Sequence, residues 1–173
     1  MEAKNENLKE SFSKAYDNFS DAIFRYCLYQ TSNKEKALDL TADTFTKTWE
    51  YISSGKELDN IRAFLYRVAN NLIIDDRRKK KSDSLDAMTE FGFDVKDEND
   101  ENKGHENAFE GKIAMEAVAQ LDEKYRDVLM LKYVDDMSIK EIAKILDETE
   151  NNISVRMHRA LEKLKNILGE NKI

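Results

Sequence analysis

The stretch that decides the fold is residues 136–168, DMSIKEIAKILDETENNISVRMHRALEKLKNIL. Apolar residues recur in steps of three and four before and after the polar run DETE, which predicts two amphipathic helices joined by a tight turn. Ser138 with Glu141 forms a capping box for the first helix, and Thr149 can cap the second. A short helix followed by a tight turn and a longer helix is the arrangement of a DNA-binding helix-turn-helix.

The polar positions at the start of the second helix carry side chains that can read bases. Asparagine can pair with adenine, arginine with guanine or a phosphate, and valine can touch a thymine methyl group. These positions are Asn151, Asn152, Ser154, Val155, Arg156 and Arg159. Two antiparallel helices packed in a bundle would show the same pattern, so this stretch alone leaves both interpretations open.

Composition favours one or two small helical domains. The chain has 173 residues, no proline and five glycines, which suits long helices. The polar N-terminal run MEAKNENLKE is no secretory signal, and no apolar run approaches ~20 residues, so a cytoplasmic protein without a membrane span is expected. Cys27 is the only cysteine, which excludes an internal disulfide and a multi-cysteine zinc site.

The distribution of charge matters more than the net charge of −7. Residues 82–111 carry ten acidic residues against two lysines, so the rest of the chain is nearly neutral. Residues 61–81 carry seven basic residues against two acids. This basic patch could contact phosphates, although a solvated, frayed helix end is the plain alternative.

Three helices are predicted before the acidic segment. The first spans residues 8–29, and the second opens at Ser32 with Glu35 completing a capping box. A loop over residues 53–60 follows, with Asp59 as the expected cap of a third helix that ends in RRKKK.

The fold expected is all-α, with two small helical domains joined by a flexible acidic linker. The first domain covers residues 8–81, and the linker covers residues 82–111, where periodicity is weak and charge is high. The C-terminal domain, residues 112–170, is expected to be a four-helix unit that contains the helix-turn-helix.

With these elements in this order, the chain resembles the extracytoplasmic-function group of bacterial sigma factors, the specificity subunits of RNA polymerase. The resemblance lies in DLTADTFTKTW (39–49), IRAFLYRVANNLIIDDRR (61–78) and LDEKYRDVLMLKYVDDMSIKEIAKIL with ISVRMHRALEKLK (121–165). It implies a sigma region 2-like first domain and a region 4-like second domain, which bind core polymerase, direct promoter recognition and melting, and start transcription.

The resemblance also implies roles for individual residues. Asp39 and Asp43 would contact core polymerase, and residues 53–60 would hold a flipped-out base. The −10 element would be contacted by Arg62, Asn71, Asp75, Arg77, Arg78 and Lys79. The −35 element would be read by Asn152, Ser154, Val155, Arg156 and Arg159.

Several positions depart from the family pattern, including Asp122, which stands where proline usually follows Leu121 and can itself cap the next helix. Ala42 stands where glutamine is frequent, and Asp76 stands where a small residue is usual and weakens the basic face. Asp147 replaces the usual glycine of the turn, but aspartate tolerates a left-handed conformation. Glu148 stands where an apolar residue is usual, and Ser154 stands where lysine is frequent. These departures affect the expected affinity for the −35 element more than the expected fold.

Two rival functions compete with this interpretation. A stand-alone helix-turn-helix regulator would bind DNA without core polymerase. A helical, metal-dependent enzyme has little support, because His105 and His158 have no partner spacing for a zinc site or a triad and no glycine-rich phosphate loop exists. No catalytic residue, metal or cofactor is expected. Core polymerase and promoter DNA are the expected partners, and an anti-sigma factor is left open.

Overall fold

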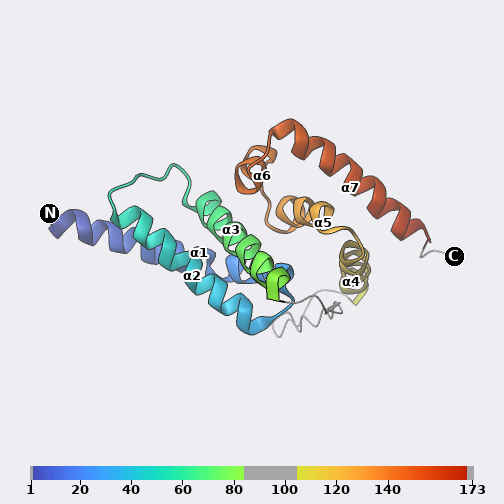
Figure 1. The fold of residues 1–173 in the computed structure, drawn as a ribbon. Helices are drawn as coiled ribbons and strands as arrows, with labels where there is room; N and C mark the ends of the chain where they lie inside the picture. The colour runs from blue at the N-terminus through green and yellow to red at the C-terminus, as the bar shows by residue number, and fades with distance from the viewer. Residues whose placement is uncertain (1, 84–104, 171–173) are drawn as a thin grey trace. The chain divides into compact units, whose positions relative to one another are not determined.

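The secondary structure of the described part of the chain is entirely helical, as predicted (Figure 1). The computed structural model describes residues 2–83 and 105–170. Its elements are α1 (Glu2–Thr31), α2 (Lys34–Ser53), α3 (Ile61–Asp83), α4 (His105–Ala119), α5 (Glu123–Leu129), the π-helical turn η1 (Met130–Val134), α6 (Ile139–Leu146) and α7 (Glu150–Glu170). None of the helices in these ranges combines the length and apolarity needed to cross a membrane.

The chain divides into two compact units, Met1–Glu90 and Phe91–Ile173. Residues 84–104, most of the predicted flexible linker, lie outside the described residues. Both flanking helices extend into the segment 82–111, because α3 continues to Asp83 and α4 begins at His105 instead of residue 112. The run HENAFEG can join α4 because its alanine and glutamates are good helix formers, and one glycine costs only about 1 kcal/mol.

In the first unit, α1, α2 and α3 pack on one another around a core with two tyrosines. Tyr26 and Tyr66 are fully buried with ring centroids 5.2 Å apart, and the Tyr26 hydroxyl donates to Asn70 Oδ1 at 3.2 Å. Cys27 is also fully buried, and this burial raises the pKa of its thiol to about 11. The buried Tyr26 hydroxyl has a hydrogen-bond partner in Asn70, which removes most of the free-energy cost of burying this polar group.

Two helix starts in the first unit lie one residue beyond the predicted caps. Asn33, not Ser32, caps α2, and its Oδ1 accepts from the Lys36 amide at 2.9 Å. Ser32 instead has a φ of +49° and its N–H donates to Leu28 O at 2.8 Å, so it closes α1. At the start of α3, Asn60 Oδ1 accepts from the Ala63 amide at 3.0 Å.

The Asn60 contact means that the predicted Asp59 cap was wrong by one position. Both Asp59 and Asn60 have the side-chain chemistry of a cap, and only the path of the loop decides between them. The same reasoning applies to Ser32 and Asn33. Ser32 forms the end of α1, so Asn33 is left to cap α2.

In the second unit, α4 and α6 each pack on α7, and α5 packs on α4 and α7. The core consists of fully buried aliphatic and methionine side chains from α5 to α7, with Val128, Leu131, Met137, Ile142, Ile145 and Ile153 at its centre. Full burial of each such side chain contributes about 1.5–3 kcal/mol. This core fixes α6 and α7 against the rest of the unit and so determines which face of α7 remains exposed.

Candidate nucleic-acid interface

The helix-turn-helix is formed by α6, the turn 147–149 and α7. Ser138 Oγ accepts from the Glu141 amide at 3.2 Å, and Glu141 Oε2 accepts from the Ser138 amide at 2.9 Å, so the predicted capping box is present. Thr149 Oγ1 accepts from the Asn152 amide at 3.2 Å, as predicted for the cap of α7. In each helix the cap side chain therefore satisfies one of the first four amides, which lack a partner within the helix.

Asp147 makes the sharp turn in a left-handed conformation, with φ 56° and ψ 47°. The Glu148 N–H donates back to Ala143 O at 2.9 Å, which closes α6. Aspartate tolerates this region better than most residues, so the turn forms without the family's usual glycine.

Substitution of Asp147 is expected to change the stability of the second unit in a direction set by this φ. Asp147→Gly removes the Cβ penalty and should raise the free energy of unfolding by up to about 1 kcal/mol, whereas Asp147→Ala should lower it by about 1 kcal/mol. Hydrogen exchange of the α6 and α7 amides measures the change. Equal effects of the two variants would contradict the assignment of strain to this residue.

The two faces of α7 are clearly separated. Ile153, Met157 and Ala160 are buried, which confirms the predicted apolar stripe, while Val155 is 43 % exposed on the opposite face. A helix held by one buried stripe presents the remaining positions of its first turns to a groove.

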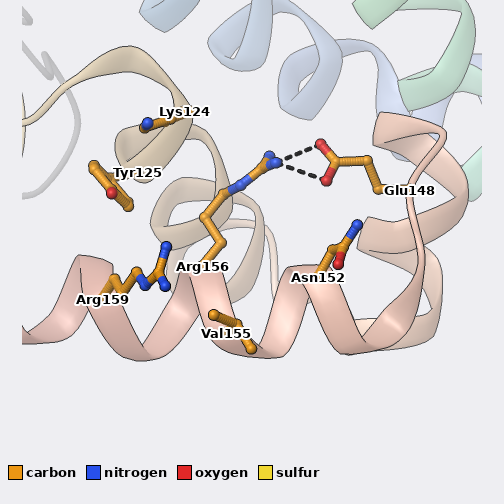
Figure 2. Close-up of a pocket in the computed structure, with 7 residues that line it drawn as sticks. All are labelled: Lys124, Tyr125, Glu148, Asn152, Val155, Arg156 and Arg159. Atoms are coloured by element: carbon orange, nitrogen blue, oxygen red, sulfur yellow. Dashed lines mark hydrogen bonds and ion pairs between the residues drawn. The ribbon is translucent and has the colours of Figure 1, made fainter.

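Four of the five predicted −35 residues line one pocket of about 380 Å³ (Figure 2). They are Asn152, Val155, Arg156 and Arg159. Ser154 is not among them, because it lies on another flank of α7 and its Oγ donates to Glu150 O at 2.9 Å. The structure thus brings together most of the predicted reading surface and leaves Ser154 apart from it.

The pocket also contains residues that the sequence interpretation missed as site residues. Lys124 and Tyr125 come from α5, and Glu148 comes from the turn. Lys124 Nζ and Lys163 Nζ lie 5.0 and 5.3 Å from the centre of the Tyr125 ring. These cations belong to different helices more than 35 positions apart, so no periodicity in the sequence could connect them.

Arg156 is already engaged within the chain. Its Nη2 lies 2.5 Å from Glu148 Oε1 and 2.6 Å from Oε2, and the two side chains are 22 % and 28 % exposed (Figure 2). Charge-assisted hydrogen bonds of this kind are roughly twice as strong as neutral ones. One of the two arginines of the predicted reading surface is therefore held by an acid from the turn.

On α3, the predicted −10 residues occupy more than one face. Asn71, Asp75 and Arg78 recur at helical spacing and are exposed together, and Arg67 continues the same face. Arg78 Nη1 lies 3.9 Å from Asp75 Oδ1, a loose and exposed pair. Lys79 is exposed beside this face. Arg67 was not among the predicted site residues, although it lies four residues before Asn71 on the same face.

Arg62 and Arg77 are half-buried and lie away from that face. Arg77 Nη2 donates to Gln30 O at 3.2 Å and to Gln30 Oε1 at 2.5 Å, so it ties α3 to the end of α1. Asp76, expected to weaken the basic face, points to α2 instead, where its Oδ1 lies 2.6 Å from Lys36 Nζ. The hydrogen bond with Asp76 raises the pKa of Lys36, and the pair fixes α2 against α3.

On α2, Asp39 and Asp43 are both exposed and four residues apart, so they share one face. Leu38 beside them is 53 % exposed. Ala42, which stands where glutamine is frequent in the family, is exposed next to Asp43. This face combines an acidic pair with an exposed aliphatic side chain, and such a pair can complement a positively charged surface of a protein partner.

The loop between α2 and α3 is exposed and turns at Gly55, which has a φ of +85°. Lys56 Nζ lies 4.7 Å from the centre of the Tyr51 ring, and this ring stacks against Phe64 at 4.6 Å. A cation and an aromatic pair therefore meet at the base of the loop predicted to hold a flipped-out base.

Both units match described families. Residues 15–82 match Sigma-70 region 2, and residues 112–164 match Sigma-70, region 4. The chain is similar to the ECF RNA polymerase sigma factor SigW of Bacillus subtilis, with 30 % identity over 94 % of this chain and 91 % of the relative. It is also similar to the ECF RNA polymerase sigma factor SigL of Mycobacterium tuberculosis, with 29 % identity over 90 % and 87 %.

Solved structures share the fold. The sigma factor RpoE in complex with the anti-sigma factor NepR from Bartonella quintana superposes with a TM-score of 0.71 at 20 % identity, covering 92 % of this chain and 98 % of that one. CnrH in complex with the cytosolic domain of CnrY gives 0.66 at 19 % identity, covering 94 % and 90 %. A match to region 2 as well as region 4 disfavours a stand-alone helix-turn-helix regulator. The chain belongs to the extracytoplasmic-function (ECF) sigma factors of the sigma-70 family.

Proposed function

We propose a division of labour between the two units of this sigma factor, which binds core RNA polymerase and directs promoter recognition, melting and transcription initiation. Within the first unit, the domain of residues 8–81 opens the −10 element while bound to core polymerase. Within the second, the domain of residues 112–170 docks on the −35 element, and residues 82–111 connect the two domains. The observation that carries the proposal is the pocket of α7, in which Asn152, Val155, Arg156 and Arg159 converge.

The −35 element is read in the major groove by the start of α7. Asn152 can pair with adenine, and Arg156 or Arg159 with guanine or a phosphate, while Val155 suits a thymine methyl group. Ser154, on another flank of α7, contacts the phosphate backbone.

The −10 element is opened by capture of unstacked bases. Asn71, Asp75 and Arg78 face the bases of one strand, and Arg62, Arg77 and Lys79 lie near phosphates. Arg77 must exchange its Gln30 contacts to do so. Unstacking costs a few kcal/mol per base, which stacking and hydrogen bonds in protein pockets offset. Residues 53–60 supply one such pocket.

Asp39 and Asp43 on α2 bind core polymerase. The chain makes and breaks no covalent bond, needs no metal or cofactor and works in the cytoplasm. An anti-sigma factor is a further partner, since a fold neighbour was solved in complex with one.

Run-off transcription with core polymerase tests the proposal. Core plus this chain should start transcripts at discrete sites on genomic fragments, and mapping those sites gives the promoter elements. Arg156→Ala should cost about 1–3 kcal/mol on a mapped promoter if Arg156 reads a base. An equal loss on a promoter with a scrambled −35 element would reduce Arg156 to a phosphate contact, and no transcript from any template would overturn the proposal.

A further inference from the structure

The pocket at the start of α7 contains one acid among several cations. Lys124, Arg156 and Arg159 contribute positive charge from α5 and α7, and Glu148 is the only carboxylate among the lining residues. Figure 2 shows the Arg156 guanidinium directed toward Glu148. A pocket of this composition attracts an anion, and the anion that it now holds is part of the chain itself.

The contact has the form of an arginine–phosphate contact. Two oxygens of one anionic group lie 2.5 and 2.6 Å from Arg156 Nη2. A phosphodiester also presents two charged oxygens to a guanidinium and can accept from the same Nη2. A backbone phosphate and the Glu148 carboxylate would therefore compete for the same donor.

The carboxylate is delivered by a well-fixed turn. The Glu148 N–H donates to Ala143 O at 2.9 Å, and its neighbours are the left-handed Asp147 and the cap Thr149. Because these contacts fix the backbone, Glu148 is presented to Arg156 at little further entropic cost.

From this geometry we propose that Lys124, Arg156 and Arg159 form a binding site for a phosphate of the DNA backbone, in which the Glu148 carboxylate stands in for the phosphate when DNA is absent. The inference rests on the proposed function in one respect, that this end of α7 meets DNA. It adds a residue from α5, Lys124, to the DNA contacts and makes Glu148 an internal competitor that weakens binding to any sequence.

Removal of the competitor should be visible in affinity and in its salt dependence. In Glu148→Gln the amide oxygen can still accept from Arg156, but the negative charge is lost, so a phosphate displaces it more easily. Affinity for a non-cognate duplex should rise roughly tenfold at low salt. The slope of log K against log salt should steepen by about 1, because one more phosphate is neutralised.

The experiment uses the full chain assembled with core RNA polymerase and a fluorescein-labelled duplex of arbitrary sequence. Anisotropy is measured from about 50 to about 200 mM salt, with core polymerase alone as the blank. Glu150→Gln is the matched control, because Glu150 is an exposed acid two residues away that does not line the pocket. Arg156→Gln and the double variant Glu148→Gln/Arg156→Gln complete a double-mutant cycle. Lys124→Gln tests the contribution of α5.

The expected result is a gain for Glu148→Gln well above that of Glu150→Gln, loss of this excess once Arg156 is replaced, and weaker binding of Lys124→Gln. Gains of equal size for the two acid variants, or no gain for Glu148→Gln, would overturn the inference. If Arg156→Gln weakens binding in that case, the proposed function stands and only the competitor role fails. If Arg156→Gln changes nothing, α7 does not contact DNA there and both fail.

Discussion

Replacement of both Asp39 and Asp43 by lysine will lower the affinity of this chain for core RNA polymerase by roughly 100-fold or more. The two carboxylates share an exposed face of α2. If this face binds core polymerase as proposed, the substitution turns two favourable charges into two repulsive ones. Like charges at an interface cost several kcal/mol. Pull-down or fluorescence titration with purified core polymerase measures the loss.

The control for this change is Asp17→Lys with Asp21→Lys. These residues form a second exposed pair of aspartates four positions apart, on α1 of the same unit. The control variant alters net charge by the same amount and should keep most of the affinity. A similar loss in both variants would mean that overall charge, and not the α2 face, controls binding. Thermal unfolding should be nearly unchanged in either, because surface substitutions usually shift stability by less than about 0.5 kcal/mol.

The second large effect concerns the buried stripe of α7. Ile153 is fully buried, and Ile153→Ala should lower the free energy of unfolding of the second unit by about 2–5 kcal/mol, since it leaves a cavity in the core. Val155 is two positions away on the opposite face. Val155→Ala should leave stability within about 0.5 kcal/mol and weaken only binding to the −35 element.

The measurement must report on the second unit alone. Trp49, the only tryptophan, lies in α2, so its fluorescence follows the first unit. Hydrogen exchange of the α7 amides follows the second unit. Far-ultraviolet circular dichroism follows both units, so an unfolding transition seen there but not in tryptophan fluorescence also belongs to the second unit. If Val155→Ala destabilised this unit as much as Ile153→Ala, the assignment of the two faces would be wrong.

The features that could be predicted from sequence are those determined by neighbours along the chain. The capping box of Ser138 and Glu141, the Thr149 cap and the left-handed Asp147 depend on a few consecutive residues, and all three are present. The caps at Ser32 and Asp59 were wrong by one residue. In both places two adjacent residues have suitable side chains, and only the chain path selects one.

Features that depend on contacts between helices could not be predicted. Asp76 was taken as part of a DNA-facing surface, whereas it pairs with Lys36 of α2. Arg77, predicted near phosphates, contacts Gln30 of α1. The pocket forms because Lys124 and Glu148 come close to α7 in the folded chain. Long charged side chains reach several ångströms from the backbone, so helical spacing alone does not predict where their charged ends lie.

The burial of Cys27 has a consequence for how the protein could sense its surroundings. Peroxides and disulfides react with thiolates that they can reach. The Cys27 sulfur is buried in the core of the first unit, and its raised pKa keeps it protonated at neutral pH. Since the chain has no other cysteine, oxidants have no reactive sulfhydryl to modify in the folded protein. An oxidative stimulus acting through thiol chemistry would therefore have to be received by another molecule.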